Sequence, residues 1–142
     1  MDTIKTEINE KHLEFIQNTI TKMSRNSFQA KAWSITVLSV ILVFYISQTE
    51  NTNFNLYFAL LIGVTVLFCL IDMYYTYLES GYRCLYNSII KGKIRKYQYS
   101  MKIPFKKQGI EQFFKTFISI HIGIFYGSIF IGLIIIKYLI QN

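Results

Sequence analysis

The chain has 142 residues, of which 52% are apolar and 17% are aromatic. A soluble domain of this length cannot usually bury so much apolar surface, so the composition argues against an ordinary soluble fold and for contact with lipid. A single proline and seven glycines favour long uninterrupted helices, and the net charge of +7 has to be interpreted from where the charges lie.

Residues 1–30 have the pattern of an amphipathic helix. Apolar side chains recur with helical spacing from residue 5 to residue 27, and most of the charged residues fall elsewhere around the helix. The stripe contains Ile8, His12, Phe15, Ile16, Thr19, Ile20 and Met23. We expect this helix to lie on the cytoplasmic side of a membrane.

Residues 31–78 contain two apolar segments, about 32–47 and 56–75, separated by the polar stretch 48–53. The first segment is close to the lower length limit for a membrane span, and Trp33 near its start suits the headgroup zone. The polar stretch is the only short turn signal between the two segments. This pattern predicts a transmembrane hairpin.

Residues 79–115 continue the helical pattern of the second span to about Ile89 and then become a basic loop containing Pro104, which would end any helix. Glu79 and Arg83 are spaced i, i+4, which supports an exposed helix. The loop cations that could contact phosphates are Lys91, Lys93, Arg95, Lys96, Lys102, Lys106 and Lys107. We interpret them as topology signals that also contact acidic lipid, with nucleotide or nucleic-acid phosphates as the alternative; DNA is not an expected partner.

Residues 116–142 contain a third apolar segment, 117–136, which is 20 residues long and sufficient to span a bilayer. Small residues recur along it at every fourth position or on the row beside it: Ser119, Gly123, Gly127 and Gly132. Such a ridge lets another helix pack closely, either from the same hairpin or from a second copy of the chain. Because three short spans bury little on their own, we expect a homo-oligomer.

Orientation follows from the distribution of lysine and arginine. Residues 1–31 contain five, residues 48–55 none, residues 79–115 nine, and the C-terminal tail only Lys137. Lysine and arginine are retained preferentially on the cytoplasmic side of a membrane. The counts therefore predict a multi-pass membrane protein with a cytoplasmic N-terminus and an extracytoplasmic C-terminus.

Asp72 is an ionisable residue about one turn inside the expected second span. Carboxylates at such depths are costly and usually have a partner or a purpose. An antiparallel hairpin turning at 48–55 would bring Lys31 to a similar depth, so we predict an intramembrane Lys31–Asp72 pair. A gating or ion-path role, or an aspartate that simply reaches the interface, are the alternatives.

Known catalytic and metal-binding patterns do not occur in the sequence. The only two histidines, His12 and His121, have no further ligands in metal-binding spacing, and there is no phosphate-binding glycine loop and no paired carboxylate motif. We therefore expect no enzyme activity, no metal and no cofactor.

Two segments, residues 12–33 and 70–87, resemble a family of small, poorly characterised bacterial inner-membrane proteins. The matching positions are Asn26, Ser27, Phe28, Lys31 and Trp33 before and within the first span, and Asp72, Tyr74, Tyr75 and Glu79 at the end of the second. The family is similar in layout to transmembrane effectors of anti-phage defence systems. That resemblance implies oligomers that compromise the inner membrane when triggered.

Two functions follow from these observations. The first is a non-enzymatic, oligomeric effector that perturbs the membrane, for example by forming pores, after its cytoplasmic helices sense a protein or nucleotide signal. The second is a constitutive anchor or accessory subunit of a partner complex. A dedicated ion channel is a weaker third interpretation, because Asp72 is the only clear acidic group within a span.

Overall fold

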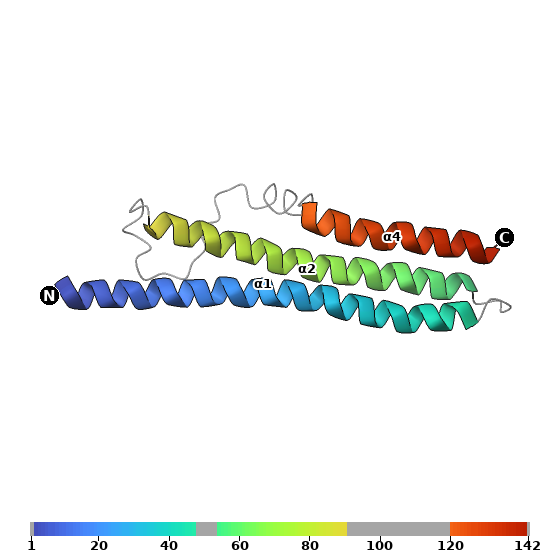
Figure 1. Cartoon of the computed structure of the whole chain (residues 1–142), viewed down its shortest axis with the longest axis horizontal. Helices are drawn as coiled ribbons and strands as arrows, with labels where there is room; N and C mark the ends of the chain where they lie inside the picture. The colour runs from blue at the N-terminus through green and yellow to red at the C-terminus, as the bar shows by residue number, and fades with distance from the viewer. Residues whose placement is uncertain (1, 48–53, 91–119, 142) are drawn as a thin grey trace.

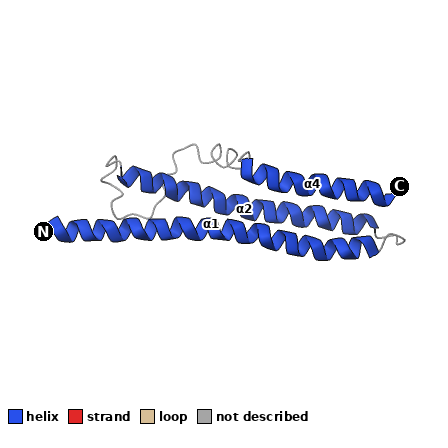
Figure 2. Ribbon diagram, viewed as in Figure 1, coloured by secondary structure: helices blue, strands red, loops and turns tan. Residues whose placement is uncertain are grey.

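The computed structural model describes residues 2–47, 54–90 and 120–141. All three described segments are α-helices: α1 (Asp2–Ser47), α2 (Phe54–Ile90) and α4 (Ile120–Gln141). No strand occurs in these segments (Figure 2). The predicted all-α class is confirmed.

α1 is one continuous helix of 46 residues, and it includes both the expected amphipathic helix and the expected first span. The sequence of α1 contains neither glycine nor proline, so nothing in it favours a break where the composition changes near residue 31. α2 likewise continues past the expected span to Ile90. The hairpin predicted from the apolar segments is therefore part of a longer pair of helices.

The three helices lie side by side with α2 in the centre (Figure 1). α1 and α2 are antiparallel along almost their whole length, and α4 packs on α2 alongside its first half. Three contacts show how α1 and α2 are aligned along their length. The ring centroids of Tyr45 and Phe58 are 6.0 Å apart, Ser27 is hydrogen-bonded to Asp72, and the Gln17 amide donates a hydrogen bond to the Tyr86 hydroxyl.

Two apolar clusters join α4 to the other helices. Toward one end, Leu38 and Tyr45 of α1 pack with Leu61 of α2 and Leu133 of α4. Near the start of α4, a second cluster contains Met73, Ile122 and Tyr126, and the Tyr126 hydroxyl donates to the Phe68 carbonyl oxygen at 3.1 Å. These contacts set the start of α4 level with Met73, about halfway along the α1–α2 pair (Figure 1).

All three helices are long and apolar enough to cross a membrane. The 22 residues of α4 would extend about 33 Å, close to the ~30 Å thickness of a bilayer core. Only 17% to 28% of the residues in the most apolar windows are buried. Large side chains such as Val43, Ile124 and Leu139 are instead more than two-thirds exposed, as expected for surfaces that face lipid.

α1 and α2 extend beyond the start of α4 as a two-helix segment, residues 2–26 and 75–90. This segment is the open end of the α1–α2 hairpin, opposite the connection between the two helices, and we call it the projecting hairpin. Ile16 and Leu85 are fully buried within it. Nearby, the Gln17 amide nitrogen lies 2.5 Å from the Tyr86 hydroxyl. The projecting hairpin thus has a packed seam of its own.

Ile16 and its neighbour Phe15 provide a matched test of this seam, because Ile16 is fully buried and Phe15 is 58% exposed. We expect Ile16→Ala to lower the free energy of unfolding by about 2–5 kcal/mol and Phe15→Ala by less than about 1 kcal/mol. Thermal unfolding of the detergent-solubilised variants, followed by circular dichroism, measures both. An equal loss for the two variants would contradict the register described above.

Candidate functional site

A run of small, buried side chains on α1 lies at the level of the candidate site. Ser27, Ala30 and Ser34 are all buried, and they recur at intervals of three and four residues along one face of the helix. Small residues let two helix backbones approach closely, which matters where no hydrophobic force drives helices together. Close approach at this level places polar atoms of α1 against Asp72 of α2.

Lys31 and Asp72 form an ion pair across this contact, as the sequence predicts. The Lys31 Nζ atom lies 2.6 Å from Asp72 Oδ2. The Asp72 side chain is completely buried, whereas the Lys31 side chain remains 21% exposed. The pair is thus accessible to polar surroundings only from the lysine side.

Ser27 bridges the two charges. Its hydroxyl donates to Asp72 Oδ1, and its oxygen accepts a hydrogen bond from Lys31 Nζ at 3.1 Å. Thr76, one turn along α2, donates to the Asp72 carbonyl oxygen at 3.0 Å. Asp72 Oδ2 has no hydrogen-bonding partner of good geometry in the described part of the chain, so the Lys31 charge is what compensates it.

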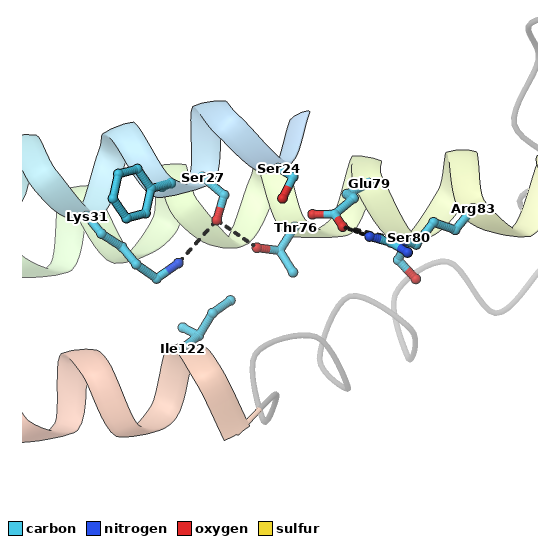
Figure 3. Close-up of a pocket in the computed structure, with 9 residues that line it drawn as sticks. Ser24, Ser27, Lys31, Thr76, Glu79, Ser80, Arg83 and Ile122 are labelled. Atoms are coloured by element: carbon cyan, nitrogen blue, oxygen red, sulfur yellow. Dashed lines mark hydrogen bonds and ion pairs between the residues drawn. The ribbon is translucent and has the colours of Figure 1, made fainter. Parts of the chain in front are cut away.

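A groove of about 480 Å³ leads from this ion pair along the projecting hairpin (Figure 3). It is lined by Ser24, Ser27, Phe28, Lys31, Thr76, Glu79, Ser80, Arg83 and Ile122. Within it, Arg83 contacts the Glu79 carboxylate oxygen Oε1 through Nε at 2.9 Å and through a terminal nitrogen at 2.8 Å. The groove therefore contains two ion pairs and several hydroxyl groups.

The glycines of the expected packing ridge have open space beside them. Among the described residues, a Cβ atom added at Gly123, Gly127 or Gly132 would meet nothing within 4 Å. Ser119, the first member of the ridge, lies outside the described residues. Of the two interpretations of this ridge, packing against the chain's own hairpin finds no support at these three glycines.

The basic loop lies outside the described residues, so its contacts with phosphates stay a prediction. That prediction covers Lys91, Lys93, Arg95, Lys96, Lys102, Lys106 and Lys107.

Ser27 and Thr76 belong to the site but are not predicted as part of the ion pair from the sequence alone. Ser27 lies four residues before Lys31 and Thr76 four residues after Asp72, so each shares a helix face with one member of the pair. Ser27 contacts both charges, whereas Thr76 donates to the backbone carbonyl oxygen of Asp72 and lies 3.5 Å from the Ser27 hydroxyl. Once Lys31 and Asp72 are known to pair, this spacing is sufficient to predict that both residues lie beside the pair. Neither residue type is distinctive without it, because serine and threonine often bond their own helix backbone.

Within the described segments, no three His, Cys, Asp or Glu side chains are grouped so that they could hold a metal ion. Comparison of the chain with protein-family models, with curated proteins and with solved structures finds no match. The ion pair, the groove and the open helix faces are therefore the features from which a function can be inferred.

A double-mutant cycle tests the ion pair. Lys31→Gln leaves a fully buried carboxylate without its counter-charge, and Asp72→Asn leaves a lysine that can still reach the groove. We expect both to destabilise the protein, Lys31→Gln by about 3–5 kcal/mol and Asp72→Asn by less. The double variant should recover part of the loss, because it removes both charges.

The measurement is the free energy of unfolding in detergent, with Ser39→Ala as a control for an exposed serine on the same helix. Single and double changes that simply add would show that the two charges are not coupled.

Proposed function

We propose that this chain is a non-enzymatic, oligomeric effector that perturbs the inner membrane of a bacterium, in the manner of the anti-phage effectors whose layout it resembles. The observation that carries the proposal is the open face of α4, where a Cβ atom at Gly123 or Gly127 would meet nothing within 4 Å in the described part of the chain. A face of this kind accepts a second helix at close range. Assembly of several copies is what a membrane-perturbing effector requires.

The small fraction of buried residues also supports assembly. At most 28% of the most apolar window of any helix is buried within the chain. The remaining surface can be covered by lipid or by further copies. Because contact with lipid and contact with helices are similarly apolar, a modest change in packing can shift the protein between the two.

The projecting hairpin provides a sensing element for this proposal. It is continuous with the spans through α1 and α2, and the Lys31–Asp72 pair lies where it meets the three-helix part. A protein or nucleotide signal that binds the hairpin would act on helices that are rigidly connected to the membrane segment. The same hairpin would also suit a constitutive anchor, so the experiments below are chosen to separate these two functions.

The proposed orientation has a direct test. Nine lysines and arginines lie between residues 79 and 115 and none between residues 48 and 55, so the former segment should remain cytoplasmic. A reporter that fluoresces only in the cytoplasm should be bright when fused after Lys107 and dark when fused after Asn142. A bright C-terminal fusion would refute three spans in this orientation.

The proposed activity is tested by overproducing the chain in bacteria while the membrane potential is recorded with a voltage-sensitive dye. We expect depolarisation, and we expect Gly123→Leu and Gly127→Leu to abolish it and to shift the solubilised protein toward the monomer. Gly132→Leu should do so less, because it lies on the neighbouring row. A leucine at each glycine has open space within the chain, so expression and thermal stability should be retained.

Two results distinguish the alternatives. An anchor should leave the membrane potential intact on overproduction, and its glycine variants should behave like the unmodified protein. Cross-linking in native membranes that finds only monomer, together with an intact membrane potential, would contradict the effector function.

A further inference from the structure

Two arginines on different helices line one hollow in the projecting hairpin. Arg25 of α1 and Arg83 of α2 share a hollow of about 390 Å³ with Ile20, Thr21, Ser24 and Phe28. Ser24, Phe28 and Arg83 also line the groove that leads to the ion pair, where Ser80 is added. We call Thr21, Ser24, Arg25, Ser80 and Arg83 the arginine groove.

Hydrogen-bond donors in the arginine groove have spare capacity. Within the described part of the chain, the Arg25 side chain makes no hydrogen bond or ion pair, and the hydroxyls of Ser24 and Ser80 have no partner. Arg83 directs Nε and one terminal nitrogen at a single oxygen of Glu79, which leaves N–H groups of its other terminal nitrogen available. Glu79 therefore holds the Arg83 guanidinium in place without saturating it.

The charges around the groove leave an excess of positive charge. Arg25, Arg83 and Lys31 are cationic, and Asp72 and Glu79 are anionic. Lys31 is engaged with the buried carboxylate, so the two guanidinium groups are the cations that an incoming ligand meets. Guanidinium forks together with hydroxyl donors are the usual recognition chemistry for phosphate oxygens.

The inner edge of the groove is apolar. Phe28 is 72% exposed and lines both hollows, and Ile122 at the start of α4 lines the inner one. Glu79, which holds Arg83, lies six residues beyond Met73 along α2, or about 9 Å past the start of the three-helix part. This is just outside the headgroup layer, which adds roughly 5–8 Å to each side of the bilayer core, and the Arg83 side chain reaches back toward that layer to contact Glu79.

We propose that the arginine groove binds the phosphate group of an anionic ligand, with Arg25 and Arg83 as its charge partners and Ser24 and Ser80 as further donors. The apolar edge at Phe28 and the depth of the groove match a phospholipid, whose phosphate adjoins an acyl chain. A soluble phosphate offers the same oxygens from the projecting side. This proposal does not depend on whether the protein is an effector or an anchor.

The test measures binding to the full-length detergent-solubilised chain by native mass spectrometry, with dioleoyl phosphatidate as the lipid probe and dioleoyl phosphatidylcholine as its zwitterionic counterpart. We expect tighter binding of phosphatidate, reduced about tenfold by Arg25→Gln and by Arg83→Gln. Lys22→Gln is the matched control, because Lys22 is exposed on the same helix and lines neither hollow. It should change binding less than twofold.

Inorganic pyrophosphate, added as a competitor, identifies the source of the phosphate. Failure of pyrophosphate to displace phosphatidate establishes the lipid as the ligand, and pyrophosphate binding that depends on Arg25 and Arg83 establishes a soluble one. Arg25→Gln should retain the thermal stability of the unmodified chain, since Arg25 has no partner to lose within the described residues. Equal losses for Arg25→Gln and Lys22→Gln, or unchanged binding in both arginine variants, would overturn the proposal.

Discussion

The carboxylate of Asp72 has no contact with solvent, and its environment constrains how α1 and α2 can pack. A buried charge without compensation is strongly destabilising, so the arrangement has to keep Lys31 and Ser27 within reach of it. A slip of one helical turn between the two helices would move these groups about 5.4 Å and separate them. The ion pair thus selects one register for an apolar contact that many registers could otherwise satisfy.

The rest of the structure is less constrained. α4 packs on one side of α2, and most apolar side chains of all three helices face outward. Apolar packing of this kind is compatible with lipid or with additional helices around the same core. The α1–α2 contact has one defined alignment, whereas the outward faces can contact either lipid or other helices. This combination suits a protein whose own fold is fixed but whose neighbours in the membrane can change.

Sequence patterns were sufficient for the helices and for the central ion pair. Apolar segments of span length and the polar turn between them determine an antiparallel hairpin, and that hairpin places Lys31 opposite Asp72. The full length of α1 is not predicted in the same way. The change from polar to apolar composition within α1 suggests a boundary between two helices, but no residue there breaks the helix.

The arginine groove could not be predicted from spacing alone. Arg25 and Arg83 line one hollow only because of how each helix is rotated about its own axis, and that rotation depends on packing along the whole seam. The glycines of α4 illustrate the same point. Their spacing identifies a face, but which partner the face meets depends on how α4 docks against α2.

The continuity of α1 has a mechanical consequence. A helix without glycine or proline behaves as a stiff rod, and Lys31 lies about 44 Å along its axis from Asp2. If α1 and the part of α2 packed against it tilt together about the ion pair, a change of about 10° carries the N-terminal end of α1 through roughly 8 Å, a rotation well within the range of tilts that membrane helices adopt. In a membrane, a change of thickness that altered this tilt would therefore displace the N-terminal end of α1 by a distance approaching the diameter of a helix.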